Sequence, residues 1–384
     1  MEEWKEYKLE EVCSRLRSGK GIKSDCISNT GLFPVIGGNG MRGYTNKSNF
    51  KGECAVIGRQ GANCGNVRFF MGEAYMTEHA VVAVGNELAD SYFLARLLSL
   101  MHLGNLSAQS AQPGLSIQTL SKQVIRLPSI SYQREISTVL KSLDDKIELN
   151  RRINDNLEQQ AQALFKSWFV DNPDSNWANT SLSEVASFVG GYSYKSEELT
   201  DFSNVAMATI KNFGRNRGFK AEGFKGINPS AKLKECHCVN LFDILVAHTD
   251  LTQNADVIGN AELLLTCGKY NSIIFSMDLV KVLPKEIFPY KFLLAAMLKN
   301  KIFKGHCLGY INGTTVLHLN KKALPEFEIR KPSDSEAKIM NETLAPYYKR
   351  MAKLLQETDK LISLRDTLLP KLMSGEVKIN ETNN

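Results

Sequence analysis

Apolar residues recur in two long, almost glycine-free segments with steps that alternate between four and three positions. The first segment begins near residue 132, and the second repeats its spacing 204 positions later. This heptad pattern is typical of coiled coils, because a straight helix drifts off a strict 3.5-residue repeat within a few heptads. We therefore expect coiled-coil helices at 132–171 and 334–375, although amphipathic helices lying on a core are the plainer alternative. The apolar seam positions are Ile136, Leu140, Leu143, Ile147, Leu157, Leu164, Met340, Leu344, Met351, Leu354, Leu361 and Leu368.

Polar residues interrupt both seams. Asn150 and Asn154 fall in the first seam, and Thr358 and Arg365 fall in the second. Such positions cost stability but fix the register and orientation of the paired helices. Pro346 lies inside the second pattern, where it should kink the helix or begin its regular part, because proline lacks an amide donor. The polar residues 333–336 supply capping groups before that helix.

The chain also repeats itself outside the helices. Trp4 and Leu9 recur as Trp177 and Leu182, which lie 173 positions later. Residues 120–122 match 319–321 at an offset of 199, and residues 125–128 match 329–332 at an offset of 204. One period spans about half the chain, so the pattern predicts a duplicated domain pair rather than a solenoid.

Each repeat opens with a mixed segment. Short β-branched runs at 55–57, 80–84, 244–246 and 279–282 predict strands, and residues 92–101 and 290–298 predict helices. The fold class is therefore α+β. We expect two α/β globules at 1–131 and 172–333, separated by two long antiparallel coiled-coil helices in a pseudo-two-fold internal repeat, with a tail at 376–384.

Composition narrows the setting only slightly. The chain has 384 residues, 47 Lys+Arg against 41 Asp+Glu, and a net charge of +6, which permits an acidic partner without requiring one. The charged N-terminus and the lack of a long apolar run predict no signal peptide and no membrane span. The eight scattered cysteines are expected to be reduced thiols in a cytoplasmic protein. Residues 236–238, Cys-His-Cys, are too closely spaced for an ordinary zinc site.

Candidate nucleic-acid chemistry gathers just after predicted strands and around glycines. Arg suits guanine, Asn and Gln suit adenine, and Lys and Arg suit phosphates. A solvated loop is the plainer interpretation of any one of these side chains, but the clusters point to DNA contact. In the first globule the candidates are Arg15, Arg17, Lys20, Lys23, Arg42, Arg59, Gln60 and Asn63. In the second globule they are Tyr192, Tyr194, Lys211, Asn212, Arg215, Arg217, His248, Thr249, Thr252, Gln253 and Asn254.

Catalytic and cofactor motifs do not emerge from the sequence. Residues 38–43 match G-x-G-x-x-G, but neither a clear crossover helix nor a suitably spaced acidic residue follows. P-loop, H-E-x-x-H and G-x-S-x-G motifs are absent from the sequence. A stand-alone methyltransferase would also need an S-adenosylmethionine-binding motif, so we expect no catalytic residue, metal or cofactor in this chain.

The sequence resembles the specificity subunit of type I restriction–modification enzymes. The resemblance rests on the Trp-x4-Leu-x-Glu-Val opening of both repeats, on residues 56–61, 248–253 and 257–259, and on the helix opening at 133–136. The closing segment 365–375 is also similar to the end of that family, so the resemblance covers nearly the whole chain.

This resemblance implies a non-catalytic subunit with two target-recognition domains. It implies double-stranded DNA with an asymmetric bipartite target as a partner, together with two methyltransferase subunits and restriction/translocase subunits. The chemistry it implies is adenine-N6 methylation, with S-adenosylmethionine, ATP and Mg in the partner subunits. A specificity subunit of a methylation-only complex and a coiled-coil scaffold for proteins are the alternatives.

Overall fold

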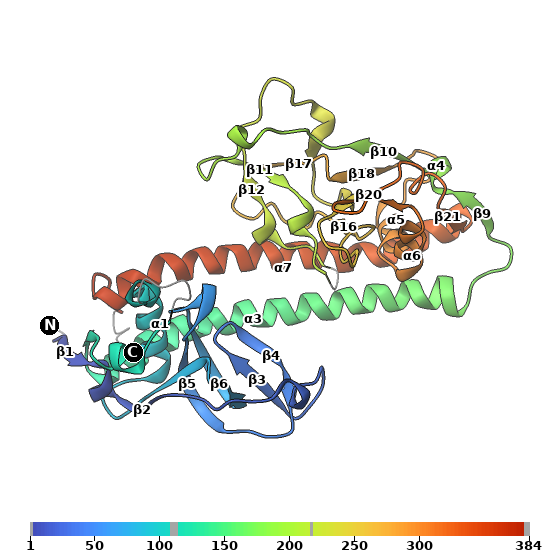
Figure 1. The fold of residues 1–384 in the computed structure, drawn as a ribbon. Coiled ribbons are helices and arrows are strands. Elements are labelled where there is room, and N and C mark those ends of the chain that lie inside the picture. Colours follow the sequence, from blue (N-terminus) through green and yellow to red (C-terminus); the bar gives the residue numbers. More distant parts are fainter. Residues whose placement is uncertain (1–2, 108–113, 216–217, 380–384) are drawn as a thin grey trace, which may run out of the picture. The chain divides into compact units, whose positions relative to one another are not determined.

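The computed structural model of the chain describes residues 3–107, 114–215 and 218–379 (Figure 1). The chain divides into two compact units, residues 1–146 with 362–384 and residues 147–361. Each unit therefore contains one globule and one half of each long helix. The expected boundaries treated the long helices as segments of their own, whereas the observed units split both helices because each half packs into the core of a globule.

A six-stranded sheet forms the centre of the first unit, in the order β2-β7-β5-β6-β3-β4. Its strands are β2 Cys13–Ser18, β3 Phe33–Gly37, β4 Gly40–Thr45, β5 Phe50–Gly58, β6 Val67–Met76 and β7 Ala80–Gly85. Successive side chains of a strand point to opposite faces. Ala55 and Ile57 therefore pack under helix α1 (Ser91–Leu100), while Cys54 and Val56 join a second cluster on the other face.

Shorter elements complete the first unit. They are β1 Lys5–Lys8, β8 Val124–Leu127, α2 Ile117–Ser121 and the 3₁₀ turns Leu9–Val12, Ser24–Cys26, Gly61–Asn63 and Leu103–Leu106. The predicted strands at 55–57 and 80–84 lie within β5 and β7, and the predicted helix at 92–101 coincides with α1.

Besides the two-stranded pair of β9 (Ala178–Ser181) and β21 (Glu328–Lys331), the described part of the second unit contains three small sheets, in the orders β10-β18-β14-β16, β12-β11-β17-β13 and β15-β20-β19. Their strands are β10 Ala186–Gly190, β11 Val205–Ala208, β12 Lys225–Gly226, β13 Cys238–Val239, β14 Ile244–Ala247, β15 Thr249–Asp250, β16 Ala261–Leu263, β17 Ser272–Phe275, β18 Leu279–Pro284, β19 Ile311–Asn312 and β20 Leu317–Leu319. Its short helices are α4 Leu182–Val185, α5 Lys291–Leu298, α6 Lys301–Leu308 and the 3₁₀ turns Ser196–Glu198, Ile210–Asn212, Ala221–Gly223 and Glu235–His237.

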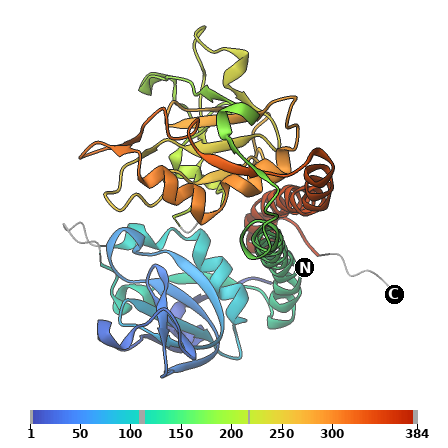
Figure 2. The same cartoon turned by 90° about the vertical axis from the view of Figure 1, so that its right-hand side faces the viewer.

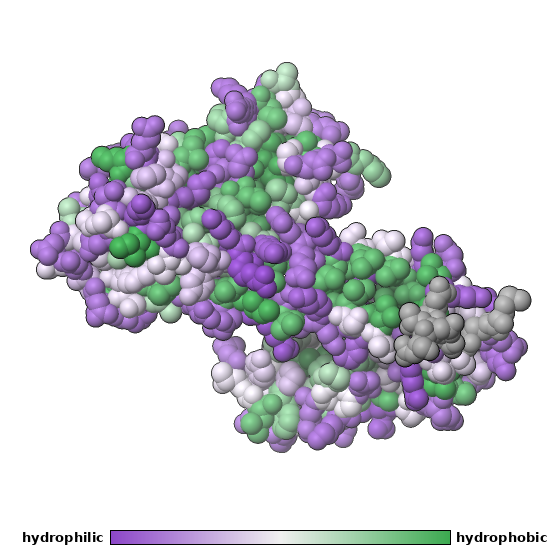
Figure 3. All heavy atoms as spheres, turned by 180° about the vertical axis from the view of Figure 1, so that it is seen from behind, coloured by the Kyte–Doolittle hydropathy of each residue, from purple (hydrophilic) through white to green (hydrophobic). Residues whose placement is uncertain are grey.

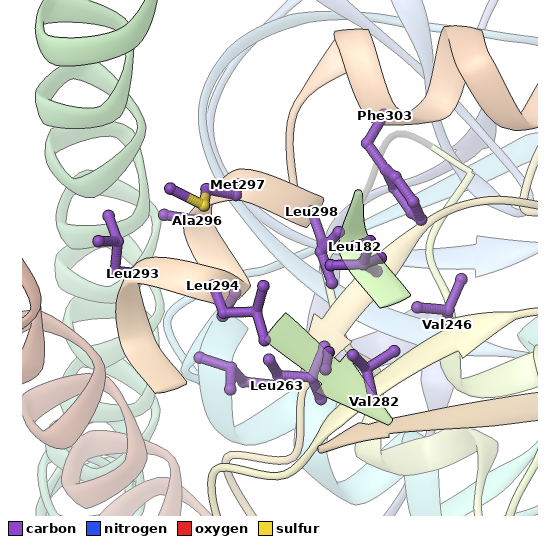
Figure 4. Packing of buried hydrophobic residues seen from close by; sticks show 14 of the residues in the cluster. Leu182, Val246, Leu263, Val282, Leu293, Leu294, Ala296, Met297, Leu298 and Phe303 are labelled. Carbon is purple, nitrogen blue, oxygen red and sulfur yellow. The ribbon is translucent and has the colours of Figure 1, made fainter. Parts of the chain in front are cut away.

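Helix α5 closes the core of this unit. Figure 4 shows its Leu294 and Leu298 gathered with Leu182, Leu263 and Val282. These side chains are almost completely buried, so α5 is fixed against the β10-β18-β14-β16 sheet.

The internal repeat is preserved in the strand pairing. Strand β1 pairs with β8 so that Lys5 faces Leu127, and β9 (Ala178–Ser181) pairs with β21 (Glu328–Lys331) so that Ala178 faces Lys331. Adding 173 to 5 gives 178, and adding 204 to 127 gives 331, so the two offsets predicted from sequence hold at these positions. The structure thus confirms the repeat residue for residue at the entry and exit of each globule.

One predicted correspondence is wrong. The amide of Leu9 donates to Gln123 O, and the amide of Leu182 donates to Phe327 O, so the offset near Leu120 is already 204 rather than 199. Leu120 therefore corresponds to Leu324 instead of Leu319. The insertion in the second repeat consequently lies earlier in the chain than the sequence match suggested.

The two long helices are α3 (Ile130–Lys166), which ends in a π turn at Ser167–Asp171, and α7 (Asp334–Ser374). The predicted cap of α7 is confirmed, because Glu336 accepts hydrogen bonds from the Ser333 amide at 3.0 Å and hydroxyl at 2.5 Å. The expectation for Pro346 is wrong in one respect. Helix α7 begins at Asp334 and continues through the proline, so Pro346 does not start its regular part.

Within each unit the halves of α3 and α7 run antiparallel, side by side (Figures 1 and 2). In the first unit Ile136 and Leu140 share a core with Leu369 and Met373. None of the predicted seam side chains is exposed. The helices nevertheless also bury residues outside the seam in the globule cores, so both the coiled-coil interpretation and the plainer alternative describe part of their packing.

Three of the four polar seam residues, Asn150, Thr358 and Arg365, bond across the helix pair, whereas the buried side-chain oxygen of Asn154 has no hydrogen-bond partner among the described residues. In the second unit Asn150 donates to Thr358 Oγ1 at 3.3 Å and to Glu357 Oε2 at 3.1 Å. In the first unit Arg365 donates to Asp144 Oδ1 at 2.9 Å. Such bonds form in only one alignment of the helices, which is the register-fixing role predicted for them.

A buried polar cluster ties each globule to its own halves of the long helices. In the first unit Asp144 of α3 accepts from Tyr92 and Arg96 of α1 as well as from Arg365 of α7. In the second unit the ammonium group of Lys299 lies 3.0 Å from Glu158 of α3 and 2.7 Å from Glu262 of β16. Its Nζ also lies 5.8 Å from the ring centre of Tyr348 of α7. No helix in the described residues is long and apolar enough to cross a membrane.

Candidate nucleic-acid interface

Equivalent backbone hydrogen bonds in the two units hold the loops that follow β5 and β14, which carry several of the predicted contact residues. In the first unit the amide of Arg59 donates to His79 O at 3.0 Å, and Arg59 O accepts from the amide of Leu115 at 2.9 Å. In the second unit the amide of His248 donates to Asp278 O at 2.8 Å, and His248 O accepts from the amide of Leu319 at 2.9 Å. Arg59 and His248 therefore occupy the same place in the two repeats.

Four turns of the first unit meet at this end of the sheet. The amide of Lys20 donates to Met76 O at 3.0 Å, and the amide of Thr77 donates to Ile36 O at 2.9 Å. The turn between β3 and β4 requires glycine at position 38, because a Cβ there would lie 2.7 Å from His79 O. The chain is thus folded so that the turns that carry Lys20 and Arg59 lie close to the β3–β4 turn, and Arg42 follows that turn near the start of β4.

Most predicted contact residues of the first unit are accessible. Arg17, Lys20, Lys23, Arg42 and Gln60 are exposed. Arg59 is partly exposed, with Nη1 3.5 Å from Ser18 Oγ. This set combines several cations with one amide, which is the mixture that phosphate contacts and base contacts require.

Arg15 and Asn63 are more structural than predicted. The guanidinium carbon of Arg15 lies 5.4 Å from the ring centre of Phe50, and burial together with the charge of Arg17 lowers the pKa of Arg15. Asn63 Oδ1 accepts from Asn66 Nδ2 at 3.2 Å. Both side chains are only partly exposed and have partners within the first unit.

Asp250 organises the corresponding loop of the second unit. It is 2% exposed, and its carboxylate accepts from the amides of Thr252, Val257 and Ile258 and from the Thr252 hydroxyl, at 2.6 to 3.1 Å. Burial alone would raise the pKa of Asp250, but these hydrogen bonds favour the anion and lower it. The loop from residue 249 to residue 258 is thus folded around one buried negative charge.

Four predicted contact residues of the second unit are instead part of its interior. Tyr192 is buried, and its hydroxyl bonds to Glu198 at 2.9 Å. Asn212 is buried between the Thr209 amide and Lys220 O. Thr249 is buried against Asp278, and Thr252 commits its hydroxyl to Asp250. Each of these four side chains therefore has a structural partner within the protein, and three of them are buried while Thr252 is only partly so. Their contact with DNA stays a prediction.

The remaining candidates of the second unit face outward to differing extents. Lys211, Arg215, Gln253 and Asn254 are exposed, and Tyr194 and His248 are partly exposed. Arg215 lies 3.5 Å from Asp256. Arg217 lies outside the described residues.

His248 differs chemically from Arg59 although the two share a backbone position. Burial, with a smaller effect from His318 and Lys321, lowers the pKa of His248, while Asp278 acts in the opposite direction. The lowered pKa favours the neutral imidazole of His248, which can both donate and accept a hydrogen bond, whereas Arg59 only donates.

Sequence reasoning missed the residues that shape the loops. Asp250 and Asp278 were not among the candidates, although an Asp at a strand end followed two residues later by Thr is a recognisable turn signal. Leu251, which is 65% exposed next to Asp250, was also overlooked because only polar side chains were considered.

The described residues contain no cluster of three or more His, Cys, Asp or Glu side chains that could hold a metal ion. His237, the centre of the Cys-His-Cys segment, accepts a hydrogen bond from the Lys234 amide at 3.2 Å through Nδ1. His237 thus helps to close the 3₁₀ turn Glu235–His237.

Known proteins of one family resemble this chain. Residues 1–159 match the family model described as the type I restriction modification DNA specificity domain. The specificity subunit of the type I restriction enzyme EcoprrI from Escherichia coli is 37% identical over 134 residues, which cover 34% of this chain and 33% of that relative. The HindI specificity subunit from Haemophilus influenzae is 26% identical over 330 residues, which cover 69% of this chain and 71% of that relative.

The fold also has a counterpart among solved structures. The type I restriction–modification S subunit from M. genitalium superposes with a TM-score of 0.60 at 17% identity, over 99% of this chain and 97% of that one. The chain matches only about a third of the EcoprrI relative, but its two-fold repeated α+β architecture extends the likeness over its whole length. Residues 1–159 are thus similar in sequence to the DNA specificity domain of type I restriction–modification systems, and the whole chain shares the fold of a solved S subunit.

Proposed function

We propose that this chain recognises an asymmetric, bipartite DNA sequence, with one half-site for each of its two α/β domains. The observation that carries the proposal is that the two domains share a backbone scaffold but present different side chains from equivalent loops. The backbone bonds that hold Arg59 and His248 are equivalent, yet one loop presents Arg59 and Gln60 while the other presents Gln253 and Asn254. Two copies of one scaffold with different side chains at the same end suit two different half-sites.

The side chains divide by the part of DNA they can bind. Exposed Arg17, Lys20 and Lys23 are suited to phosphates, which set affinity but carry no sequence information. Arg59 is suited to the O6 and N7 acceptors of guanine, and Gln253 and Asn254 are suited to adenine. Gln253 already donates its amide to Thr314 O at 2.5 Å, which holds that side chain in place.

The chain acts, in this proposal, inside a larger complex in the cytoplasm. Two methyltransferase subunits and the restriction/translocase subunits supply catalysis, together with S-adenosylmethionine, ATP and Mg. The number of unread base pairs between the half-sites depends on the length of the two long helices. The similarity of residues 1–159 to the type I restriction modification DNA specificity domain and the paired parts of the long helices in each unit support this arrangement.

Modified-base sequencing of the host genome tests the proposal. Deleting the gene for this chain should abolish N6-methyladenine at one bipartite, non-palindromic motif, and restoring the gene should bring it back. A methylation pattern that is unchanged by the deletion would refute the proposed function.

A further inference from the structure

The loop that follows β15 presents an apolar side chain among polar ones. Leu251 is 65% exposed, although its neighbour Asp250 is buried and Gln253 and Asn254, farther along the same loop, are exposed polar residues. Apolar and hydrophilic residues alternate over the molecular surface in Figure 3, so one exposed leucine is not unusual by itself. Its setting within a candidate DNA-contacting loop makes it informative.

The loop holds Leu251 in a fixed position. Four hydrogen bonds to the Asp250 carboxylate close the loop on both sides of Leu251, and Gln253 ties it to Thr314 O. Ala255 has a φ of 54°, which a residue with a Cβ adopts only when its surroundings enforce it. The backbone that carries Leu251 is therefore pre-organised for contact, because little backbone conformational entropy remains to be lost on binding.

The neighbouring turn, between β17 and β18, also exposes an apolar side chain. His248 and Thr249 bond to Asp278, so the turn between β17 and β18 lies against the start of the Leu251 loop. Met277 in that turn is 59% exposed. The end of the sheet therefore offers apolar side chains together with amide groups that can bind base edges.

We propose that Leu251 reads a thymine of the second half-site through the 5-methyl group of that base. The 5-methyl of thymine is the apolar group that an A·T pair presents in the major groove, next to the acceptors and donors that Gln and Asn bind. An apolar contact there distinguishes T from C without any hydrogen bond. This inference rests on the proposed DNA-recognition function and names one of its specificity-determining residues.

The test replaces thymine with deoxyuridine, which lacks only the 5-methyl group. The full chain is purified with the methyltransferase subunits of its host and titrated with DNA duplexes that contain the motif identified by modified-base sequencing. In these duplexes each thymine of the second half-site is replaced in turn by deoxyuridine. We expect one substitution to weaken binding about fourfold, which corresponds to burial of one methyl group, about 0.8 kcal/mol at 1.4 kcal/mol per tenfold. In Leu251→Ala the thymine and deoxyuridine duplexes should bind equally at that position.

Ile287→Ala is the matched control, because Ile287 is 63% exposed and follows the other end of β18. It should keep the full preference for thymine, and both variants should melt at the wild-type temperature. Tight motif binding that is indifferent to every deoxyuridine, or a Leu251→Ala loss that is equal on both duplexes, would overturn the inference while leaving DNA recognition intact. Failure of the wild-type complex to prefer its motif over mixed DNA would instead refute the proposed function.

Discussion

The two domains place chemically different side chains on one backbone position. Arg59 is cationic and can form paired hydrogen bonds to guanine, whereas burial lowers the pKa of His248 and so favours its neutral form. A single position of the scaffold can therefore change its base preference without a change in the strands that carry it. There is no room for a Cβ at Gly38, and hydrogen bonds to Asp250 hold the other loop, so the backbone around these positions is restricted. Changes of sequence that alter the base preference are therefore confined to side chains that point outward.

Arg59→Ala should weaken binding to one half-site. Loss of a paired guanine contact costs about 1–3 kcal/mol and relaxes the preference at one base pair, while the other half-site is read as before. Competition binding with single-base variants of the motif measures the effect. Arg126→Ala removes another exposed arginine of the first unit and should leave every base preference unchanged. An equal loss at all positions of both half-sites would contradict a base contact by Arg59.

Asp250→Asn should loosen the loop of the second domain. The amide group cannot accept all of the hydrogen bonds that the buried carboxylate receives, so the free energy of unfolding should fall by about 2 kcal/mol at pH 7. The folded-state pKa of Asp250 is lowered, so its contribution is complete above about pH 4 and is lost as the pH falls through the folded pKa. Urea unfolding at pH 7 and at lower pH should show the difference between variant and wild type shrinking. The exposed Asp201→Asn serves as the control, and a difference that grows on acidification would contradict the assignment.

Sequence reasoning located the loops but not the role of each side chain in them. Strands and glycines are visible as local patterns, so the positions after β5 and β14 could be predicted. Whether Tyr192 or Asn212 faces solvent depends on partners that are distant in sequence, such as Ser230 for Tyr192 and Lys220 for Asn212. A polar residue near glycine is an equally good candidate for a DNA contact and for a buried hydrogen bond, and only tertiary structure separates the two.

At the scale of the helices, the buried ionic cluster around Lys299 fixes the second domain to its half-helices. Lys299 and Glu262 are only 6% and 2% exposed, and Glu262 also accepts from the Gly218 amide at 2.6 Å. The cluster therefore connects α3, α5, β16 and the basic segment that contains Lys211 and Arg215. Burial alone would lower the pKa of Lys299, but Glu158 and Glu262 outweigh it and raise that pKa.

Lys299→Met should destabilise the second unit by about 3–5 kcal/mol, because it leaves two carboxylates buried without their cation. The folded-state pKa of Lys299 lies above its unfolded value, so the loss should be constant from pH 6 to pH 9 and decline only as the pH rises past the unfolded pKa. Denaturant unfolding measures both effects. The triple variant Glu158→Gln/Lys299→Met/Glu262→Gln should recover most of the stability, and exposed Lys301→Met should lose little. A triple variant no more stable than the single one would show that packing, rather than charge, dominates at this site.

The whole molecule was predicted best where it repeats. The offsets of 173 and 204 reproduce the pairing of β1 with β8 and of β9 with β21, because both repeats must close their globule with the same two strands before the long helix begins. The offset of 199 at residues 120–122 failed because a three-residue match is too short to locate an insertion. The heptad pattern also did not predict that each long helix is divided between the two units. The pattern identifies the positions where the two helices meet, but it does not show which globule core the other faces of each helix pack into.

Exchange of residues 1–131 for the corresponding domain of a relative with a different target should change one half of the methylated motif and leave the other half unchanged. In the described part of the chain, the backbone of Arg59 bonds to His79 and Leu115 of its own unit, and the backbone of His248 bonds to Asp278 and Leu319 of its own unit. Neither loop therefore depends on the identity of the other domain for its conformation. Modified-base sequencing of cells that carry the chimera provides the measurement, and the reciprocal exchange of residues 172–333 should alter only the half-site that the first chimera retained. If either chimera changed both halves together, the two domains would not be independent readers, and recognition would have to be assigned to a surface that they form jointly.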